Sequence, residues 1–227
     1  MSTPEETQET TVNSTPPAND NTWHERPNAD EIPCPALLSF YNNDLLNPDE
    51  DGNVTTGQLE DVLASVGLNA RVRTILAKGA DKTDEAPGSF NLFGLRESTL
   101  DHTGSTGIRD PKVDPDKLES ALLDSSENGR MYAEHFAAAA NHAQLQDPGV
   151  KGTIIQALEF SALLEVFGRV DESKKRYLTV DDVKGLWIDG KFPKDWQPRA
   201  SDEIGVDDVA AGVTAIAVKR LLQLLGI

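Results

Sequence analysis

Cysteine, aromatic residues and positive charge are all scarce in this chain. Cys34 is the only cysteine in 227 residues, so no intramolecular disulfide can form, and a single cysteine is typical of proteins from a reducing compartment. Lys and Arg number 21 against 38 Asp and Glu, which gives a formal net charge of −17 at pH 7. This excess of negative charge argues against binding to nucleic acid or to an anionic membrane, because both attract basic surfaces.

Long apolar runs are missing as well. No run approaches the ~18 residues that a membrane-spanning helix needs, and the sequence does not open with the basic and apolar pattern of a signal peptide. We therefore expect no membrane span and an intracellular, cytoplasmic location.

The first 31 residues contain little that could be buried. This segment is rich in Thr, Pro, Glu, Asp and Asn, and Trp23 is its only large apolar side chain. Such a segment buries too little surface to offset the entropy that is lost on ordering. We therefore predict a disordered acidic tail over residues 1–31. A single domain is expected over residues 32–227, a length typical of one domain.

The rest of the chain shows the apolar periodicity of helices, and no convincing alternating strand pattern appears. Thr55 and Gln58 have the spacing of a capping box, and Asn69 is a typical N-cap for the next helix. Helices are expected over residues 35–45, 55–67, 69–79, 116–123, 131–145, 154–167, 180–188 and 207–225. The predicted fold is therefore all-α, a single domain of about seven to nine helices with long loops.

One stretch, NPDEDGNVTTGQ (Asn47–Gln58), resembles the calcium-binding loop of an EF-hand. Counting from Asn47, Asp49 and Asp51 fall at positions three and five, and a glycine follows at position six. Position twelve, however, is Gln58, which cannot supply the bidentate carboxylate of a tight calcium site.

A second stretch, DESKKRYLTVDD (Asp171–Asp182), is a poorer copy of the same pattern. Lys175 falls at position five, and Arg176 replaces the glycine. The two copies lie too far apart in the sequence to pair as adjacent hands. The simpler interpretation of each copy is a polar turn before an N-capped helix, and calcium binding is the alternative.

Cys34 stands between two prolines and before an apolar run, in the sequence EIPCPALLSF. Pro35 suits the first position of a helix, which places Cys34 at the N-cap. A sulfur at this position is directed at the first backbone N–H groups of the helix. These donors and the helix dipole favour thiolate over thiol. The pattern therefore indicates either a fixed sulfur anion or an inert, buried cysteine in a turn.

Four segments, in order along the chain, resemble motifs of the heme-thiolate peroxygenases and chloroperoxidases. They are PCPALLSFYNN, LDHTGSTGIRD, ALEFSALLEVFG and DGKFPKDWQPRASDEIGVDDV. They are similar, respectively, to the family's proximal cysteine motif, its acidic motif, the stretch around its catalytic glutamate, and its C-terminal acidic and Trp-Pro-Arg-like loop. The resemblance spans Pro33 to Val209, which is nearly all of the predicted domain.

This resemblance implies a chloroperoxidase-like helical domain around a buried heme b, with Cys34 as the axial ligand of the heme iron. Pro33, Pro35, Ala36 and Leu37 would lie against the cofactor. An anionic sulfur trans to iron promotes cleavage of the O–O bond of hydrogen peroxide. The implied activity is that of a peroxidase or peroxygenase acting on small aromatic or apolar molecules, as in the tailoring of a natural product.

The resemblance also implies a distal acid–base that moves a proton between the two peroxide oxygens. Glu159 matches the family's glutamate, and His102 is a second candidate, as helper or substitute. Without the resemblance, Glu159 would be interpreted as a dipole partner at a helix start and His102 as a solvated loop residue. Many members of the family place an arginine before this glutamate, and the nearest cation here is Lys151.

In the family, the acidic motif holds a magnesium or manganese ion beside a heme propionate. Asp101 and Ser105 match two of its ligands, whereas Thr103 replaces a carboxylate. Hard divalent cations depend on the charge of their ligands, so we expect magnesium to bind more weakly than in the family, or not at all.

An apolar loop is expected over residues 81–108. Its apolar residues are candidates for lining the substrate channel, with core packing as the alternative. They are Phe90, Leu92, Phe93, Leu95 and Leu100. Two other functions remain open from the sequence: an EF-hand-like calcium-binding helical protein, and a heme-free interaction domain that keeps the fold.

Overall fold

The computed structural model describes residues 23–81, 88–97, 115–142, 149–200 and 202–224. These residues form eight α-helices and two small antiparallel sheets. The prediction of a mainly helical fold is therefore confirmed. The prediction of a strictly all-α fold is wrong, because short strands join loops that are far apart in the sequence.

The bounds of the elements follow the order of the chain. They are η1 (Ala29–Glu31), α1 (Pro35–Asn42), β1 (Asn53–Thr55), α2 (Thr56–Ser65), α3 (Ala70–Asp81), β2 (Ser89–Asn91), η2 (Gly94–Glu97), α4 (Pro115–Ser125), β3 (Arg130–Met131), α5 (Ala133–His142), α6 (Gly149–Phe167), β4 (Arg169–Val170), β5 (Arg176–Thr179), α7 (Val180–Lys184), η3 (Gly185–Asp189) and α8 (Val206–Leu224).

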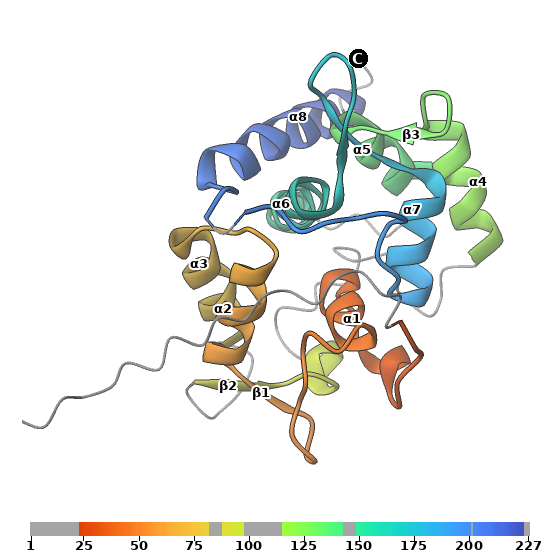
Figure 1. Cartoon of the computed structure of the whole chain (residues 1–227). Helices are drawn as coiled ribbons and strands as arrows, with labels where there is room; N and C mark the ends of the chain where they lie inside the picture. Colours follow the sequence, from red (N-terminus) through yellow and green to blue (C-terminus); the bar gives the residue numbers. More distant parts are fainter. Residues whose placement is uncertain (1–22, 82–87, 98–114, 143–148, 201, 225–227) are drawn as a thin grey trace, which may run out of the picture.

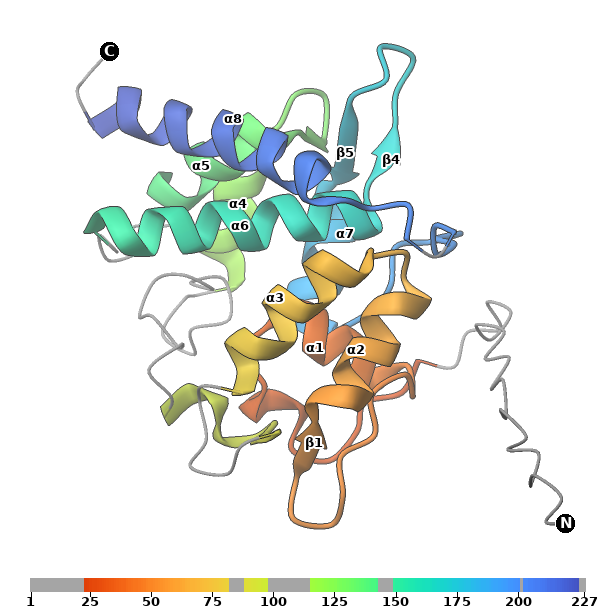
Figure 2. The ribbon, with the colours of Figure 1, turned by 90° about the vertical axis from the view of Figure 1, so that its left-hand side faces the viewer.

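Helix α6 runs through the middle of the molecule (Figures 1 and 2). Helices α5 and α8 pack against it on one side, and α1, α2 and α3 lie on the other side. Strands β1 and β2 lie at one end of the molecule, and strands β3, β4 and β5 lie at the opposite end (Figure 1). Within the described ranges, no helix combines the length and the apolar composition needed to cross a membrane.

Local signals explain where several helices begin. Thr55 and Gln58 form the predicted capping box at the start of α2, and Thr179 and Asp182 form a second one at the start of α7. The side-chain oxygen of Asn69 accepts the backbone N–H of Val72 at 3.0 Å, as expected for the N-cap of α3.

Other helix ends differ from the prediction. Helix α3 continues through Gly79 to Asp81, because one glycine costs a helix only about 1 kcal/mol. Helix α6 begins at Gly149 rather than near residue 154. Helix α7 ends at Lys184 and continues as the π-helical turn η3 to Asp189.

The strands were missed because each is too short to show an alternating pattern. Strand β1 pairs with β2, with Val54 opposite Phe90, and β5 pairs with both β3 and β4, with Leu178 opposite Met131. All four of these side chains are fully buried. The strands therefore fix the loops to the core rather than forming a separate sheet layer.

Residues 23–31 belong to the folded part, which corrects the predicted tail over this range. Trp23 Nε1 donates to the backbone oxygen of Asp189 at 3.0 Å. Arg26 lies over the ring of Tyr41, 4.0 Å from its centroid, and donates to the backbone oxygen of Tyr41 at 3.0 Å. Ala29 is buried. The remainder of the predicted tail, residues 1–22, lies outside the described residues.

Helices α6 and α8 cross at very close range. Ser161 Oγ on α6 donates to the backbone oxygen of Val209 on α8 at 2.6 Å. A Cβ atom at Gly212 would lie 3.0 Å from Ser161 Cβ and still closer to its hydroxyl oxygen. Only a glycine therefore permits this approach of the two helices.

We expect Gly212→Ala to destabilise the fold by about 1–3 kcal/mol, the usual cost of overpacking a close contact. Chemical denaturation monitored by circular dichroism measures this change. Gly57→Ala is the matched control, because a Cβ there meets nothing closer than Thr55 Oγ1 at 3.9 Å. The control should be neutral or slightly stabilising. Equal stability of the two variants would show that the helices can separate without cost.

An ionic junction lies at the C-terminal end of α6. Glu165 Oε2 accepts from Arg176 Nε at 2.7 Å and from Arg199 Nη1 at 3.0 Å, and Arg199 also pairs with Glu203. Burial raises the pKa of Glu165 more than the two arginines lower it. Ionisation of Glu165 is therefore less favourable in the folded chain than in the unfolded one, so its contribution to stability falls as the pH rises through that pKa. The junction fixes geometry more than it adds stability.

Candidate functional site

Cys34 is the N-cap of α1, as the sequence predicts, with extended backbone angles (φ −82°, ψ 120°) and a proline in the first turn. Pro33 and Pro35 are buried, whereas Cys34, Ala36 and Leu37 are partly exposed. The side chain of Cys34 makes no capping hydrogen bond, so the expected N–H contact to sulfur is not formed. The sulfur nevertheless belongs to the residue at the N-terminal, positive end of the helix dipole.

Buried amide side chains hold α1 at its other end. Asn42 Nδ2 donates to the backbone oxygen of Asp189 at 2.9 Å, and Asn43 Nδ2 donates to that of Gly190 at 3.1 Å. Asn42 and Asn43 are only 1% and 6% exposed, so water does not compete for these bonds. The orientation of α1, and with it the position of Cys34, is therefore fixed against the end of η3.

Glu159 lies in the middle of α6, because the helix begins earlier than predicted. The alternative interpretation, a carboxylate in the first turn that interacts with the helix dipole, therefore does not apply. The Oε2 atom of Glu159 is buried although the residue is partly exposed. Its neighbours Leu158 and Phe160 are 44% and 3% exposed, so Glu159 lies at the boundary between the core and the surface of α6.

The two helices that carry Cys34 and Glu159 are in contact. Phe40 of α1 and Phe167 of α6 have ring centroids 6.1 Å apart. Cys34 and Glu159 both precede this contact in their own helix, each by fewer than about three helical turns. The packing of these two rings therefore links the helices that carry the two candidate residues.

Several predicted site residues lie outside the described residues. They are Asp101, His102, Thr103 and Ser105 of the acidic motif, together with Leu100. Lys151 belongs to α6, but its side chain is not described. The roles of these residues stay predictions.

The residues predicted to line a substrate channel lie mostly in the core. Phe90 and Leu92 are fully buried, and Leu95 is 8% exposed. Phe93 is partly exposed and makes an edge contact with Tyr41, with ring centroids 5.7 Å apart. These positions favour the core-packing alternative for Phe90, Leu92 and Leu95, whereas Phe93 keeps one accessible face.

The described ranges also bear on whether side chains could hold a metal ion without a cofactor. No cluster of three or more His, Cys, Asp or Glu side chains that could hold a metal occurs in those ranges. A heme iron requires only an axial donor from the protein. Cys34 is partly exposed and stands at the N-terminal end of a helix, and its role as an axial donor stays a prediction.

The EF-hand-like loop Asn47–Gln58 has the expected turn. Asp49 Oδ1 accepts the backbone N–H groups of Asn53 at 2.8 Å and of Asp51 at 3.0 Å. The bond from Asn53 is the main reason why the pKa of Asp49 is lowered. Gly52 has a φ of 85°, which a residue without Cβ adopts at no steric cost.

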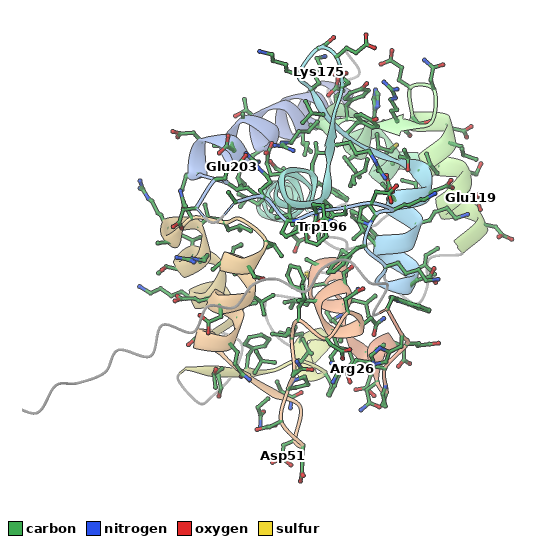
Figure 3. The ribbon with its side chains drawn as sticks, viewed as in Figure 1. Arg26, Asp51, Glu119, Lys175, Trp196 and Glu203 are labelled. Atoms are coloured by element: carbon green, nitrogen blue, oxygen red, sulfur yellow. The ribbon has the colours of Figure 1, made fainter. Side chains whose placement is uncertain are left out.

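Donors of the protein itself occupy the two ends of this loop. Arg26 Nη1 donates to Asn47 Oδ1 at 2.8 Å, and Gln58 Nε2 donates to the backbone oxygen of Asn47 at 3.3 Å. Figure 3 shows Arg26 at the base of the loop and Asp51 at its tip. This position of Arg26 was not predicted, because Arg26 lies in the segment expected to be disordered.

We expect calcium to bind weakly or not at all to this loop. Arg26 places a positive charge at the first ligand position, and Gln58 supplies no carboxylate at the last. Isothermal titration calorimetry of the whole chain measures the affinity, and Gln58→Glu is the matched variant in which affinity should rise. Micromolar affinity that disappears in Asp49→Ala would contradict the expectation.

Each EF-hand-like loop pairs with a different segment through its eighth residue, and the two predicted copies do not pair with each other. Leu178 of the second copy lies opposite Met131, which is the eighth residue of a third loop, DSSENGRMYAEH (Asp124–His135). Gly129, the sixth residue of that loop, has a φ of 74°. Sequence analysis missed this loop, although its glycine and the following apolar residue have the same spacing.

The paired second and third loops are also closed by contacts within the protein. Tyr132 donates its hydroxyl to Asp171 Oδ2 at 3.1 Å. Asp182, at the twelfth position, forms an ion pair with Arg169. Lys175 lies at the tip of the hairpin between β4 and β5 (Figure 3). A tyrosine and cations therefore occupy positions that a calcium ion would need.

No family model matches the chain, and neither does any curated protein.

Proposed function

We propose that the protein is a heme-thiolate peroxidase or peroxygenase that uses hydrogen peroxide to oxidise or oxygenate small aromatic or apolar molecules. The observation that carries this proposal is Cys34, the single cysteine of the chain, at the N-cap of α1 between two buried prolines. The four ordered motifs of the sequence support the same assignment.

Cys34 would hold the heme iron through its sulfur. Pro33 and Pro35 restrict the backbone on either side of it. Ala36 and Leu37 offer partly exposed apolar surface in the next two positions, against which a porphyrin can pack. A bound heme supplies the redox chemistry that splits the O–O bond of peroxide.

The contribution of Glu159 is the transfer of a proton. Its carboxylate would accept a proton from one oxygen of hydrogen peroxide and return it to the other oxygen. The burial of the Oε2 atom supports this role, because the interactions of a charged group are stronger away from bulk water. We propose His102 as a helper in the same transfer.

A visible absorption spectrum of the purified protein tests the proposal directly. A Soret band is expected, and the reduced protein with carbon monoxide should show the strongly red-shifted band of thiolate ligation. A chain that takes up no heme would instead favour the heme-free interaction domain.

Calcium binding is the second candidate function. The pairing of helix–loop–helix units, with Leu178 opposite Met131, favours it, and the internal contacts that close the loops oppose it. The calorimetric titration described above distinguishes this candidate from the heme protein.

A further inference from the structure

A buried tryptophan connects the helix of Glu159 to the end of α7. Trp187 lies in the π-helical turn η3 and is 1% exposed. Its ring stacks on Phe160 of α6 and on Phe136 of α5, with centroids 5.8 Å and 6.1 Å away. Phe160 directly follows Glu159, so Trp187 packs against the segment of α6 that carries the candidate acid–base.

The same turn is bound to the helix of Cys34. The backbone oxygen of Asp189, the last residue of η3, accepts from Asn42 Nδ2 at 2.9 Å and from Trp23 Nε1 at 3.0 Å. The next residue, Gly190, has a φ of 64°, and a Cβ there would lie 2.5 Å from Leu38 Cγ of α1. Helix α1 and the turn are therefore joined both by buried hydrogen bonds and by close packing.

We propose that Trp187 is a positioning residue, which, together with the turn that contains it, sets the placement of Cys34 relative to Glu159. One side of η3 holds α6 through the ring of Phe160, and its end holds α1 through the amides of Asn42 and Asn43. The proposal rests on the proposed function for its significance. The coupling of Trp187 to α1, however, can be measured in protein without heme.

The π-helical form of η3 supports this role. A π-helical turn is wider than an α-helical one and is found frequently at functional sites. It follows directly on α7, whose start is fixed by the Thr179–Asp182 capping box. The same short element therefore sets both the orientation of the Trp187 side chain and the positions of the carbonyl groups at the end of the turn.

The test compares Trp187→Leu with Trp187→Phe in the heme-free protein. Two readouts report on α1: hydrogen exchange of its backbone amides, and the rate at which a thiol reagent modifies Cys34, the only thiol in the chain. We expect Trp187→Leu to speed both by about tenfold, which corresponds to ~1.4 kcal/mol in the local opening equilibrium. Trp187→Phe keeps a ring and should restore most of the protection.

Leu68→Ala is the control for general destabilisation, because Leu68 is equally buried but lies outside α1, α6 and η3. Leu68→Ala should lower the protection of backbone amides evenly along the chain. The reactivity of Cys34 should then rise by no more than the average increase in amide exchange. Trp187→Leu should instead affect α1 and the middle of α6 more than α2 and α3.

Asn42→Leu tests the other end of the link and should reproduce the effect on Cys34. If Trp187→Leu does not fold, Asn42→Leu provides the test of the same contact between η3 and α1. Folded variants with normal exchange in α1 and normal Cys34 reactivity would overturn the proposal. Because both readouts use heme-free protein, a chain that binds no heme would refute the proposed function while leaving the link measurable.

In the heme-loaded protein, a positioning role predicts one further result. The pH profile of the reaction with peroxide should change shape in Trp187→Leu and return in Trp187→Phe, because the ring of Trp187 packs on Phe160, the residue that follows Glu159 on α6. An unchanged profile with only a lower yield of folded protein would show that Trp187 merely fills the core.

Discussion

Cys34→Ala is expected to abolish thiolate ligation of heme. The chain contains no other thiol, and alanine offers the iron no donor. The reduced carbonyl complex of the wild-type protein should therefore show a strongly red-shifted Soret band that the variant lacks. Cys34 is partly exposed, so the fold should lose less than about 1 kcal/mol.

Cys34→Ser is the matched control for size and polarity. Serine keeps the volume of the side chain and is a good N-cap, but its hydroxyl is not ionised at neutral pH. It should preserve the fold and lose the thiolate band. A wild-type spectrum of the histidine type, or unchanged ligation in Cys34→Ala, would refute the assignment of Cys34 as axial ligand.

Glu159→Gln is expected to slow the reaction of the heme-loaded protein with hydrogen peroxide by roughly 100-fold or more, the usual cost of a lost general acid–base. Glutamine keeps the shape of the side chain on α6 but cannot accept and return a proton. Stopped-flow absorption after mixing with peroxide measures the rate. Glu60→Gln on α2 is a control for the same chemical change at a distant position.

His102→Ala should cost less and mainly change the pH profile. Reference pKa values of ~4.3 for Glu and ~6.5 for His place the two titrations in different pH ranges. If His102→Ala removes the reaction and Glu159→Gln does not, the roles of the two residues are reversed. If neither change matters, the chain has the fold without peroxide chemistry.

Helices with a capping signal were predictable from the sequence, because the signal is local. Thr55 with Gln58, and Asn69, each satisfy the first N–H groups of a helix within a few residues. Helix ends without such a signal were not predictable. Helix α6 has an additional turn that begins at Gly149, and η3 departs from α-helical geometry. The positions of both depend on tertiary packing.

The candidate site was predictable only in its chemistry. The proline-flanked cysteine at an N-cap can be predicted from three residues, Pro33, Cys34 and Pro35, since proline fixes the local backbone. The contacts that fix α1 cannot be predicted in this way, because Asn42 donates to the backbone oxygen of Asp189, far along the chain, and Trp23 donates to the same oxygen. For the same reason, Arg26 was assigned to a disordered tail although it packs on Tyr41.

The short strands have a consequence for how fast the chain folds. Mainly helical proteins are rich in local contacts and fold quickly, whereas contacts between residues far apart in the sequence require the entropy of a long loop to be spent first. Val54 pairs with Phe90, and Met131 pairs with Leu178. Both pairings should therefore form after the helices, and the chain should fold more slowly than its helix content alone would suggest.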